Sequence, residues 1–268
     1  MAFARANGIV LHHRVSGRDG APWVVFANSL GTDFRIWDEV AEALGDRYRI
    51  LCYDKRGHGL SEATPSPYRL DNHVGDLEAL LAHVGVTRAV LVGLSVGGLI
   101  VQSLAARRPD LAAGIVLADT GHKIGTAEMW NARIETVQTK GIAAMADAIM
   151  ERWFTPAYRS ADNPDFTGYL AMLTRTPAEG YAGTCAALRD ADLTESTRGL
   201  KLPALLIVGD RDGATPPDLV RSTADLIEDS RFEIIADAGH IPCVEKPAET
   251  IALIGGFLEQ IADKEWRR

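Results

Sequence analysis

The chain has 268 residues, of which 47% are hydrophobic and 24% are charged, as expected for a folded globular protein with a large core. Its 28 Lys and Arg residues against 36 Asp and Glu residues give a net charge of −8 without any basic run, which argues against nucleic acid as a partner. No stretch of about 18 apolar residues is present to span a membrane, and the N-terminus lacks the pattern of a signal peptide. We therefore expect a cytoplasmic protein with no membrane partner.

The cysteines of the chain do not indicate a functional site. The three cysteines, Cys52, Cys185 and Cys243, are odd in number and far apart. Their spacing indicates neither a disulfide framework nor a zinc site. We expect each to be buried as a small apolar side chain.

Short apolar runs alternate with amphipathic segments through most of the chain. Short β-branched runs predict strands at residues 9–15, 23–27, 48–52, 89–92, 114–118, 204–208 and 232–235. Helical spacing of apolar residues predicts helices at residues 37–44, 77–84, 97–107 and 250–261. Buried strands separated by helices favour an α/β fold, with a mostly parallel central sheet flanked by helices on both faces.

The strand pattern stops between residues 121 and 198, where only helical patterns and loops remain. Open α/β sheets bind ligands at the carboxyl edge of their strands. We therefore predict a core domain formed by residues 1–120 and 199–268, with residues 121–198 inserted as a helical lid over that edge.

A candidate nucleophile lies in Gly93-Leu94-Ser95-Val96-Gly97, which matches the G-x-S-x-G pattern of a serine at a sharp strand-to-helix turn. Ser95 follows one predicted strand and precedes a predicted helix, as this turn requires. The small residues on either side of Ser95 would let the turn close. The sharp turn would then force Ser95 into a strained backbone conformation and expose its hydroxyl. The alternative is a serine that only caps a glycine-rich helix.

A serine hydroxyl is a weak nucleophile unless a base accepts its proton. His240 follows the predicted strand at residues 232–235 and lies in a loop, as a general base should. Asp210 and Asp212 both follow the predicted strand at residues 204–208, and either could orient the histidine. The chain order Ser, Asp, His is the order that the α/β-hydrolase triad uses.

Among the seven histidines, His240 alone has the chain position that the base requires. A histidine side chain is exposed to water when it lies on an edge strand of a sheet or on the outer surface of a helix. Solvated positions are expected for His12, His13, His73 and His83, a structural turn for His58, and either the surface or the cleft for His122.

A tetrahedral intermediate also needs donors for its oxyanion. The first candidate is the N–H of Val96, directly after the nucleophile. The second is the N–H of Leu30, in the loop that follows the predicted strand at residues 23–27. The small neighbours Ser29 and Gly31 would let this backbone approach a substrate, although an ordinary tight turn has the same composition.

With these motifs the chain resembles the α/β-hydrolase superfamily over nearly its whole length, and the 3-oxoadipate enol-lactonases in particular. In the pattern of this family, Asp212 before Pro216 is preferred to Asp210 as the triad acid. Val96 departs from the Met that family members often carry, but only its backbone N–H is needed. The segments that carry the resemblance are residues 28–33, Trp37, and residues 53–61, 93–98, 152–156 and 180–190.

The resemblance implies a serine hydrolase that opens the lactone ring of 3-oxoadipate enol-lactone in the β-ketoadipate pathway of aromatic catabolism, without a metal or organic cofactor. Such an anionic lactone carries a carboxylate, for which Arg is the usual bidentate partner. Arg133 of the lid is the leading candidate for this contact, with a solvated helix face as the alternative. Trp130 and Trp153 would either wall the pocket or form the core of the lid.

Two other hydrolases share this triad: one that cleaves a carbon–carbon bond in a vinylogous diketone, and a carboxylesterase. The lid and residues 28–33 favour the lactonase. A non-catalytic ligand receptor of this fold is disfavoured, because it would be expected to lack a triad member. An Asp-nucleophile enzyme is disfavoured because position 95 is Ser.

Overall fold

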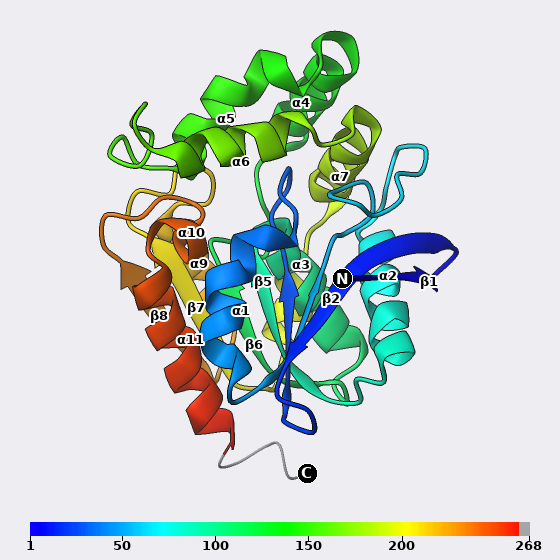
Figure 1. Ribbon diagram of the computed structural model, residues 1–268, viewed down its shortest axis with the longest axis vertical. Coiled ribbons are helices and arrows are strands. Elements are labelled where there is room, and N and C mark those ends of the chain that lie inside the picture. Colours follow the sequence, from blue (N-terminus) through cyan, green and yellow to red (C-terminus); the bar gives the residue numbers. More distant parts are fainter. Residues whose placement is uncertain (263–268) are drawn as a thin grey trace.

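The computed structural model describes residues 1–262 and places an eight-stranded sheet at the centre of the molecule (Figure 1). The strands are β1 (Ala2–Ala6), β2 (Ile9–Gly17), β3 (Trp23–Ala27), β4 (Arg49–Tyr53), β5 (Ala89–Leu94), β6 (Ala112–Ala118), β7 (Ala204–Gly209) and β8 (Ser230–Ile235). Their order across the sheet is β1-β2-β4-β3-β5-β6-β7-β8. β2 pairs antiparallel with β1 and with β4, and the other neighbouring pairs are parallel. The mostly parallel sheet predicted from the sequence is confirmed.

Helices cover both faces of the sheet. α1 (Asp38–Gly45) packs against α11 (Pro247–Ala262) on one face, and α2 (Leu70–Val84) packs against α3 (Val96–Arg107) on the other (Figure 1). α9 (Pro217–Ala224), which the sequence analysis did not predict, lies against β7 and β8. The short helices η1 (Phe34–Trp37) and α10 (Pro242–Glu245) complete the core. None of the helices within residues 1–262 is long and apolar enough to cross a membrane.

The central strands are apolar throughout because helices cover both of their faces. Every residue of β5, β6 and β7 is buried. This packed centre gives a rigid support for the loops that follow each strand, where the candidate site residues lie.

Between β6 and β7 the chain forms helices and loops, as predicted. These helices are α4 (Ala127–Lys140), η2 (Ile142–Met145), α5 (Ala146–Trp153), α6 (Pro164–Thr174), α7 (Ala178–Asp190) and α8 (Thr194–Arg198). Figure 1 shows α4, α5 and α6 as a layer above the sheet, while α7 contacts α2 and α8 contacts α3. The insertion therefore forms a lid that returns to the core at its end, and its exact limits at residues 121 and 198 stay a prediction.

The prediction that His12 and His13 are solvated is wrong. β1, which the sequence analysis did not identify, pairs with β2, so that β2 is not the edge of the sheet. His12 and His13 are only 4% and 5% exposed. His12 Nδ1 lies 2.7 Å from Asp54 Oδ2, so this side chain has a buried polar partner instead of water.

His73 is also buried, contrary to the prediction of a surface position. Its ring packs edge-on against Tyr68, and its Nε2 lies 3.4 Å from the hydroxyl oxygen of Thr184 in α7. The lid helix α7 covers this face of α2, which the sequence pattern of α2 alone does not reveal. His83 is exposed and all three cysteines are buried, as predicted.

Candidate active site

Ser95 lies in a sharp turn between β5 and α3, with backbone angles φ 58° and ψ −120°. A positive φ is rare and strained for a residue with a side chain. The flanking glycines permit the turn, because a Cβ on Gly93 would lie 2.3 Å from the carbonyl oxygen of Gly97. A Cβ on Gly97 would lie 2.2 Å from the carbonyl oxygen of Ala27. The structure thus has the strained serine that the G-x-S-x-G pattern predicts.

Neighbouring segments hold this turn in place. The N–H of Ser95 donates to the carbonyl of Ala118 at 3.0 Å, and the Thr120 hydroxyl donates to the carbonyl of Ser95 at 2.6 Å. Val96 is the first residue of α3, so its N–H has no acceptor within the helix and adds to the positive end of the helix dipole. The N–H of Val96 is therefore available to a negative charge that forms beside Ser95.

His240 and Asp212 form a buried pair at the ends of two neighbouring strands. His240 Nδ1 lies 2.9 Å from Asp212 Oδ2, and their side chains are 2% and 0% exposed. Asp212 also accepts hydrogen bonds from the Thr215 hydroxyl at 2.6 Å and from the Ala214 N–H at 2.7 Å. Burial alone would raise the pKa of Asp212, but the charge and hydrogen bond of His240 and the bonds from Thr215 bring it below its ordinary value. This contact and the lowered pKa suit Asp212 to orient His240 as an anion.

Asp210, the other candidate acid, has a different environment. It is exposed, and its carboxylate lies 3.6 Å from the guanidinium of Arg211. Its Oδ1 accepts a hydrogen bond of 3.3 Å from the N–H of Ala238 and none from His240. The geometry therefore favours Asp212 as the partner of the histidine.

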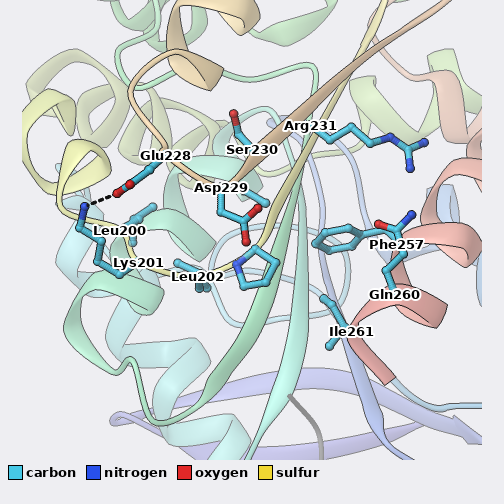
Figure 2. A pocket seen from close by; sticks show the side chains of 12 residues that line it. Leu200, Lys201, Leu202, Glu228, Asp229, Ser230, Arg231, Phe257, Gln260 and Ile261 are labelled. Atoms are coloured by element: carbon cyan, nitrogen blue, oxygen red, sulfur yellow. Dashed lines mark hydrogen bonds and ion pairs between the residues drawn. The ribbon is translucent and has the colours of Figure 1, made fainter. Parts of the chain in front are cut away.

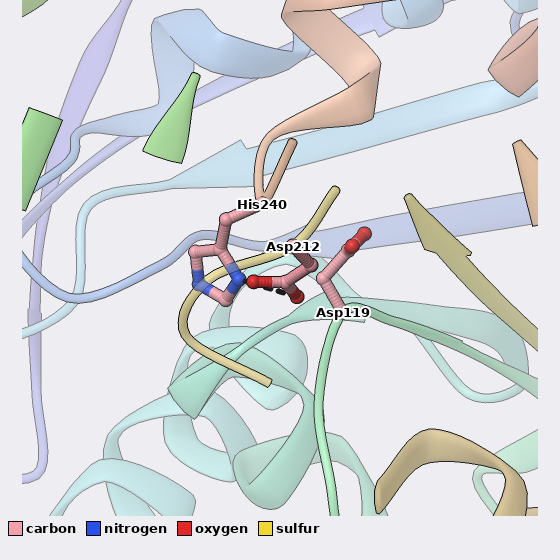
Figure 3. Close-up of side chains that lie close together, drawn as sticks. All are labelled: Asp119, Asp212 and His240. Atoms are coloured by element: carbon pink, nitrogen blue, oxygen red, sulfur yellow. Dashed lines mark hydrogen bonds and ion pairs between the residues drawn. The ribbon is translucent and has the colours of Figure 1, made fainter. Parts of the chain in front are cut away.

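A second carboxyl group, Asp119, lies directly after β6 and beside this pair (Figure 3). It is 0% exposed, its Oδ1 accepts a hydrogen bond of 2.9 Å from the N–H of Gly209, and its Oδ2 has no partner among the described residues. Burial, and then the charge of Asp212, raise the pKa of Asp119 well above its ordinary value. The buried site therefore favours the protonated form of Asp119 over the carboxylate. Asp119 was not predicted as a site residue, although it follows a predicted strand.

The same group of side chains could contact a metal ion. One ligand atom each from Asp119, Asp212 and His240 lies within 4.8 Å of the others. A metal here would have to replace the direct hydrogen bond between His240 and Asp212 and bind Asp119 in its ionised form, which burial disfavours. The arrangement therefore suits proton transfer better than metal binding.

One cavity of about 60 Å³ opens onto the candidate catalytic residues. It brings together every predicted site residue except Asp212, which is bonded to His240, and Val96, which contributes only backbone. The side chains of Trp130 and Trp153 are 4% and 5% exposed, so they belong both to the packed lid and to the cavity wall. The predicted residues that line the cavity are Ser95, His240, Leu30, Trp130, Arg133 and Trp153.

Two lid arginines line this cavity, and within residues 1–262 neither is paired with a carboxylate. Nη1 of Arg133 lies 3.5 Å from the hydroxyl oxygen of Tyr181, and its guanidinium lies 5.2 Å from the ring centre of Trp130. Arg152, at the end of α5, was not predicted as a site residue, although it directly precedes Trp153. Guanidinium groups without an acidic partner are suited to bind an anionic group of a substrate.

Leu30 follows β3 and lines the cavity together with Ser29. It is 6% exposed, and its N–H has no hydrogen-bond acceptor in the described part of the chain. A buried N–H without an acceptor is uncommon and marks a place where a ligand atom can bind. Gly31, beside it, has φ 77°, and a Cβ there would lie 2.7 Å from Leu173 Cδ1 of the lid, so glycine is needed at this position.

A larger hollow of about 480 Å³ lies at the opposite edge of the sheet, where β7 and β8 begin (Figure 2). Its polar groups include an ion pair of 3.0 Å between Lys201 and Glu228. None of the predicted site residues lines it. The groups suited to nucleophilic catalysis are therefore gathered at the carboxyl edge, beneath the lid.

The sheet, the strained serine and the His–Asp pair define an α/β-hydrolase, and the chain belongs to that family: its residues 22–140 match the alpha/beta hydrolase fold. Within the family it is 35% identical to 3-oxoadipate enol-lactonase 2 of Acinetobacter baylyi, over 90% of each chain. It is 33% identical to 3-oxoadipate enol-lactonase 1 of the same organism, over 95% of each chain. The crystal structure of the enol-lactonase from Burkholderia xenovorans LB400 matches with a TM-score of 0.94 and 38% identity, covering 96% of this chain and 100% of that chain.

Proposed function

We propose that this chain is a serine hydrolase that opens the lactone ring of 3-oxoadipate enol-lactone to give 3-oxoadipate, in the β-ketoadipate pathway. The observation that carries the proposal is the single cavity that joins Ser95, His240 and the guanidinium of Arg133. The similarity to the enol-lactonases of A. baylyi and B. xenovorans supports this choice of substrate.

In the first step, Ser95 Oγ attacks the lactone carbonyl while His240 accepts the hydroxyl proton. The Asp212 carboxylate, 2.9 Å from His240 Nδ1, holds the tautomer that leaves Nε2 free and stabilises the imidazolium that forms. The carbonyl oxygen becomes an oxyanion, which accepts hydrogen bonds from the N–H groups of Leu30 and Val96.

Collapse of this intermediate breaks the ring C–O bond. The ring oxygen leaves as an enolate, whose negative charge is delocalised, and takes the proton back from His240. Because the ester was cyclic, the leaving group stays attached to the acyl-enzyme on Ser95. His240 then activates a water molecule that hydrolyses the acyl-enzyme, and the released enol tautomerises to 3-oxoadipate.

The carboxylate of the substrate needs a cationic partner in a site where Ser95 and His240 are only 8% and 1% exposed. Arg133 and Arg152 both line the cavity beside Ser95, and no acidic side chain in the described residues neutralises them. We propose that they bind this carboxylate, with Trp130 and Trp153 as the walls that contact the apolar parts of the ring.

A steady-state assay with enol-lactone generated in situ, beside a neutral aryl ester of similar size, tests the proposal. We expect a much higher kcat/KM on the lactone, and Ser95→Ala should remove nearly all turnover of both substrates. Activity on the ester alone would indicate a carboxylesterase instead. Preferential cleavage of a vinylogous diketone would indicate a carbon–carbon bond hydrolase.

A further inference from the structure

Lys55 is a buried lysine that the mechanism above does not use. It lies in the turn that follows β4 and is only 1% exposed. Its Nζ donates to the backbone carbonyl of Ser29 and lies 3.4 Å from the carbonyl of Thr32. Within the described residues no carboxylate forms an ion pair with it. Burying an unpaired ammonium is costly, and the backbone carbonyls that bind Lys55 offset part of this cost. These carbonyls therefore indicate what Lys55 does.

The carbonyl that Lys55 binds belongs to the same peptide unit as the N–H of Leu30. In a planar trans peptide, the C=O and N–H bonds point in opposite directions. The Ser29 oxygen also accepts hydrogen bonds from the hydroxyl of Thr32 at 2.9 Å and from its N–H at 3.3 Å. Three donors thus hold this oxygen on one side of the peptide and leave the N–H of Leu30 on the other side, without an acceptor in the described chain.

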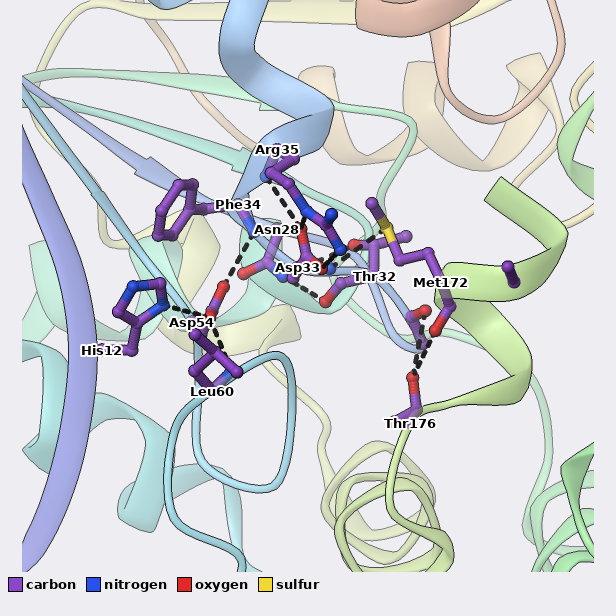
Figure 4. A network of polar contacts seen from close by, with 12 residues as sticks. His12, Asn28, Thr32, Asp33, Phe34, Arg35, Asp54, Leu60, Met172 and Thr176 are labelled. Atoms are coloured by element: carbon purple, nitrogen blue, oxygen red, sulfur yellow. Dashed lines mark hydrogen bonds and ion pairs between the residues drawn. The ribbon is translucent and has the colours of Figure 1, made fainter. Parts of the chain in front are cut away.

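Further bonds hold the same loop from the core and from the lid (Figure 4). The side chain of Asn28 donates to the carbonyl of Thr32. On the lid side, the hydroxyl of Thr176 lies 3.3 Å from the carbonyl oxygen of Gly31. The orientation of the peptide that carries the Leu30 N–H is therefore set before a substrate binds.

The charged groups around Lys55 leave its charge only partly compensated. The charges of Asp54 and Asp33 act on Lys55, but each carboxylate is already bonded to another side chain (Figure 4). Burial lowers the pKa of Lys55 to about 7, while the charges of Asp54 and Asp33 act to raise it. The nearby His58 and His73 are neutral, because burial first, and then the charge of Lys55, lower their pKa well below the ordinary value.

We propose that Lys55 is a positioning residue of the oxyanion hole. Its ammonium binds the Ser29 carbonyl, keeps the Leu30 N–H directed toward Ser95, and adds positive charge behind the amide that receives the oxyanion. This inference rests on the proposed function, because it takes the Leu30 N–H as an oxyanion donor. Negative charge at this position develops in the transition state, so the effect belongs to kcat rather than to substrate binding.

Lys55→Met tests this role, because Met keeps most of the side-chain volume and removes the charge. With a neutral aryl ester as substrate, we expect kcat to fall by about 10- to 100-fold while KM changes by less than about twofold. Thr32→Val is the matched control, since it removes a neutral donor to the same oxygen and keeps the ammonium; its loss of kcat should stay below about fivefold. An unchanged kcat in Lys55→Met, or equal losses in both variants, would overturn the proposal.

A measurement on the wild-type protein covers the case in which Lys55→Met does not fold. A boronic acid that adds to Ser95 places a negatively charged oxygen where the oxyanion forms, so by linkage it should raise the pKa of Lys55. Nuclear magnetic resonance of ¹³C-labelled lysine follows the Lys55 signal, which we expect to titrate near pH 7. A titration that the boronic acid leaves unchanged would contradict the proposed role.

Ser95→Ala separates this inference from the function on which it rests. If that variant still hydrolyses the ester, the proposed active site itself is wrong. If Ser95→Ala is inactive while Lys55→Met has the full kcat, the active site stands and only the role of Lys55 is wrong.

Discussion

The backbone N–H of His240 donates a hydrogen bond of 2.8 Å to the backbone carbonyl of Trp153, the last residue of the lid helix α5. One residue earlier, the carbonyl of Arg152 accepts a hydrogen bond of 3.3 Å from the N–H of Gly213, in the loop that carries Asp212. The end of α5 is therefore bonded to both loops that hold the His–Asp pair. A shift of this part of the lid would change the position of the candidate base as well as the shape of the cavity.

Gly239→Ala should disturb this junction, because a Cβ at Gly239 would lie 2.3 Å from the carbonyl oxygen of Trp153. We expect the free energy of unfolding to fall by about 1–3 kcal/mol, as for other overpacked sites, and kcat to fall with it. Gly256→Ala in α11 is the matched control, because no atom lies within 4 Å of a Cβ there. Ala should leave its stability unchanged or raise it by up to about 1 kcal/mol. Urea unfolding measures the free energy of unfolding of both variants. Equal values for the two variants would show that the contact with Trp153 does not contribute to stability.

Asp212→Asn and Asp210→Asn should have opposite outcomes. Asp212 is bonded to His240, and its loss would leave the wrong tautomer and an unsupported imidazolium, so we expect kcat to fall by about 10⁴-fold. Asp210 is exposed and does not contact the histidine, so Asp210→Asn should keep nearly the full kcat. The measurement is the kcat of each variant and of the wild type on the same ester substrate. A large loss in Asp210→Asn with a small one in Asp212→Asn would reverse the assignment.

Asp119 should make the protein less stable as the pH rises. The pKa of Asp119 is raised in the folded protein, first by burial and then by the charge of Asp212. In the unfolded protein Asp119 has the ordinary pKa of an exposed Asp, about 4. Above about pH 4 the unfolded state therefore loses a proton that the folded state keeps. Because the folded state binds more protons, the free energy of unfolding falls as the pH rises from about 4 through the raised pKa. Asp119→Asn, which is neutral at every pH, should therefore gain stability relative to the wild type as the pH rises.

Urea unfolding of the wild type and Asp119→Asn at several values between about pH 5 and pH 8 measures this difference. Asp212 contributes with the opposite sign, since its pKa is lowered in the folded protein and its contribution is lost as the pH falls through that value. Between about pH 5 and pH 8 the contribution of Asp212 is constant, because its lowered pKa lies below this range. A stability difference that does not change with pH would mean that Asp119 is not held in its neutral form.

Arg133→Ala and Arg152→Ala should each raise KM for the anionic lactone by about tenfold or more, the value of a hydrogen bond to a charged group. KM for a neutral aryl ester should stay nearly unchanged, because it has no carboxylate to bind. Arg175→Ala is the matched control, since Arg175 is an exposed lid residue that does not line the cavity. Equal changes in KM on both substrates would argue against carboxylate binding by these two residues.

Much of the fold could be predicted from the sequence because its determinants are local. Apolar strands such as WVVFA at Trp23–Ala27 indicate coverage on both faces, and the loss of that pattern after residue 120 indicates the helical insertion. The conformation of Ser95 was also predictable, because Gly93 and Gly97 are needed wherever a chain closes this turn. These features depend on residues that are close together in the chain.

The tertiary structure alone decided which polar groups lose their contact with water. His12 is buried because its ring stacks on Phe34 and contacts Phe3 of β1, and the pKa of Asp119 is raised because the fold buries it beside Asp212. Tertiary packing also brings Lys55 to the Ser29 carbonyl across 26 positions of sequence, and it places Arg152, although exposed, at the cavity. Sequence periodicity reports the face of one element, whereas burial, charge state and partner depend on which distant surfaces meet.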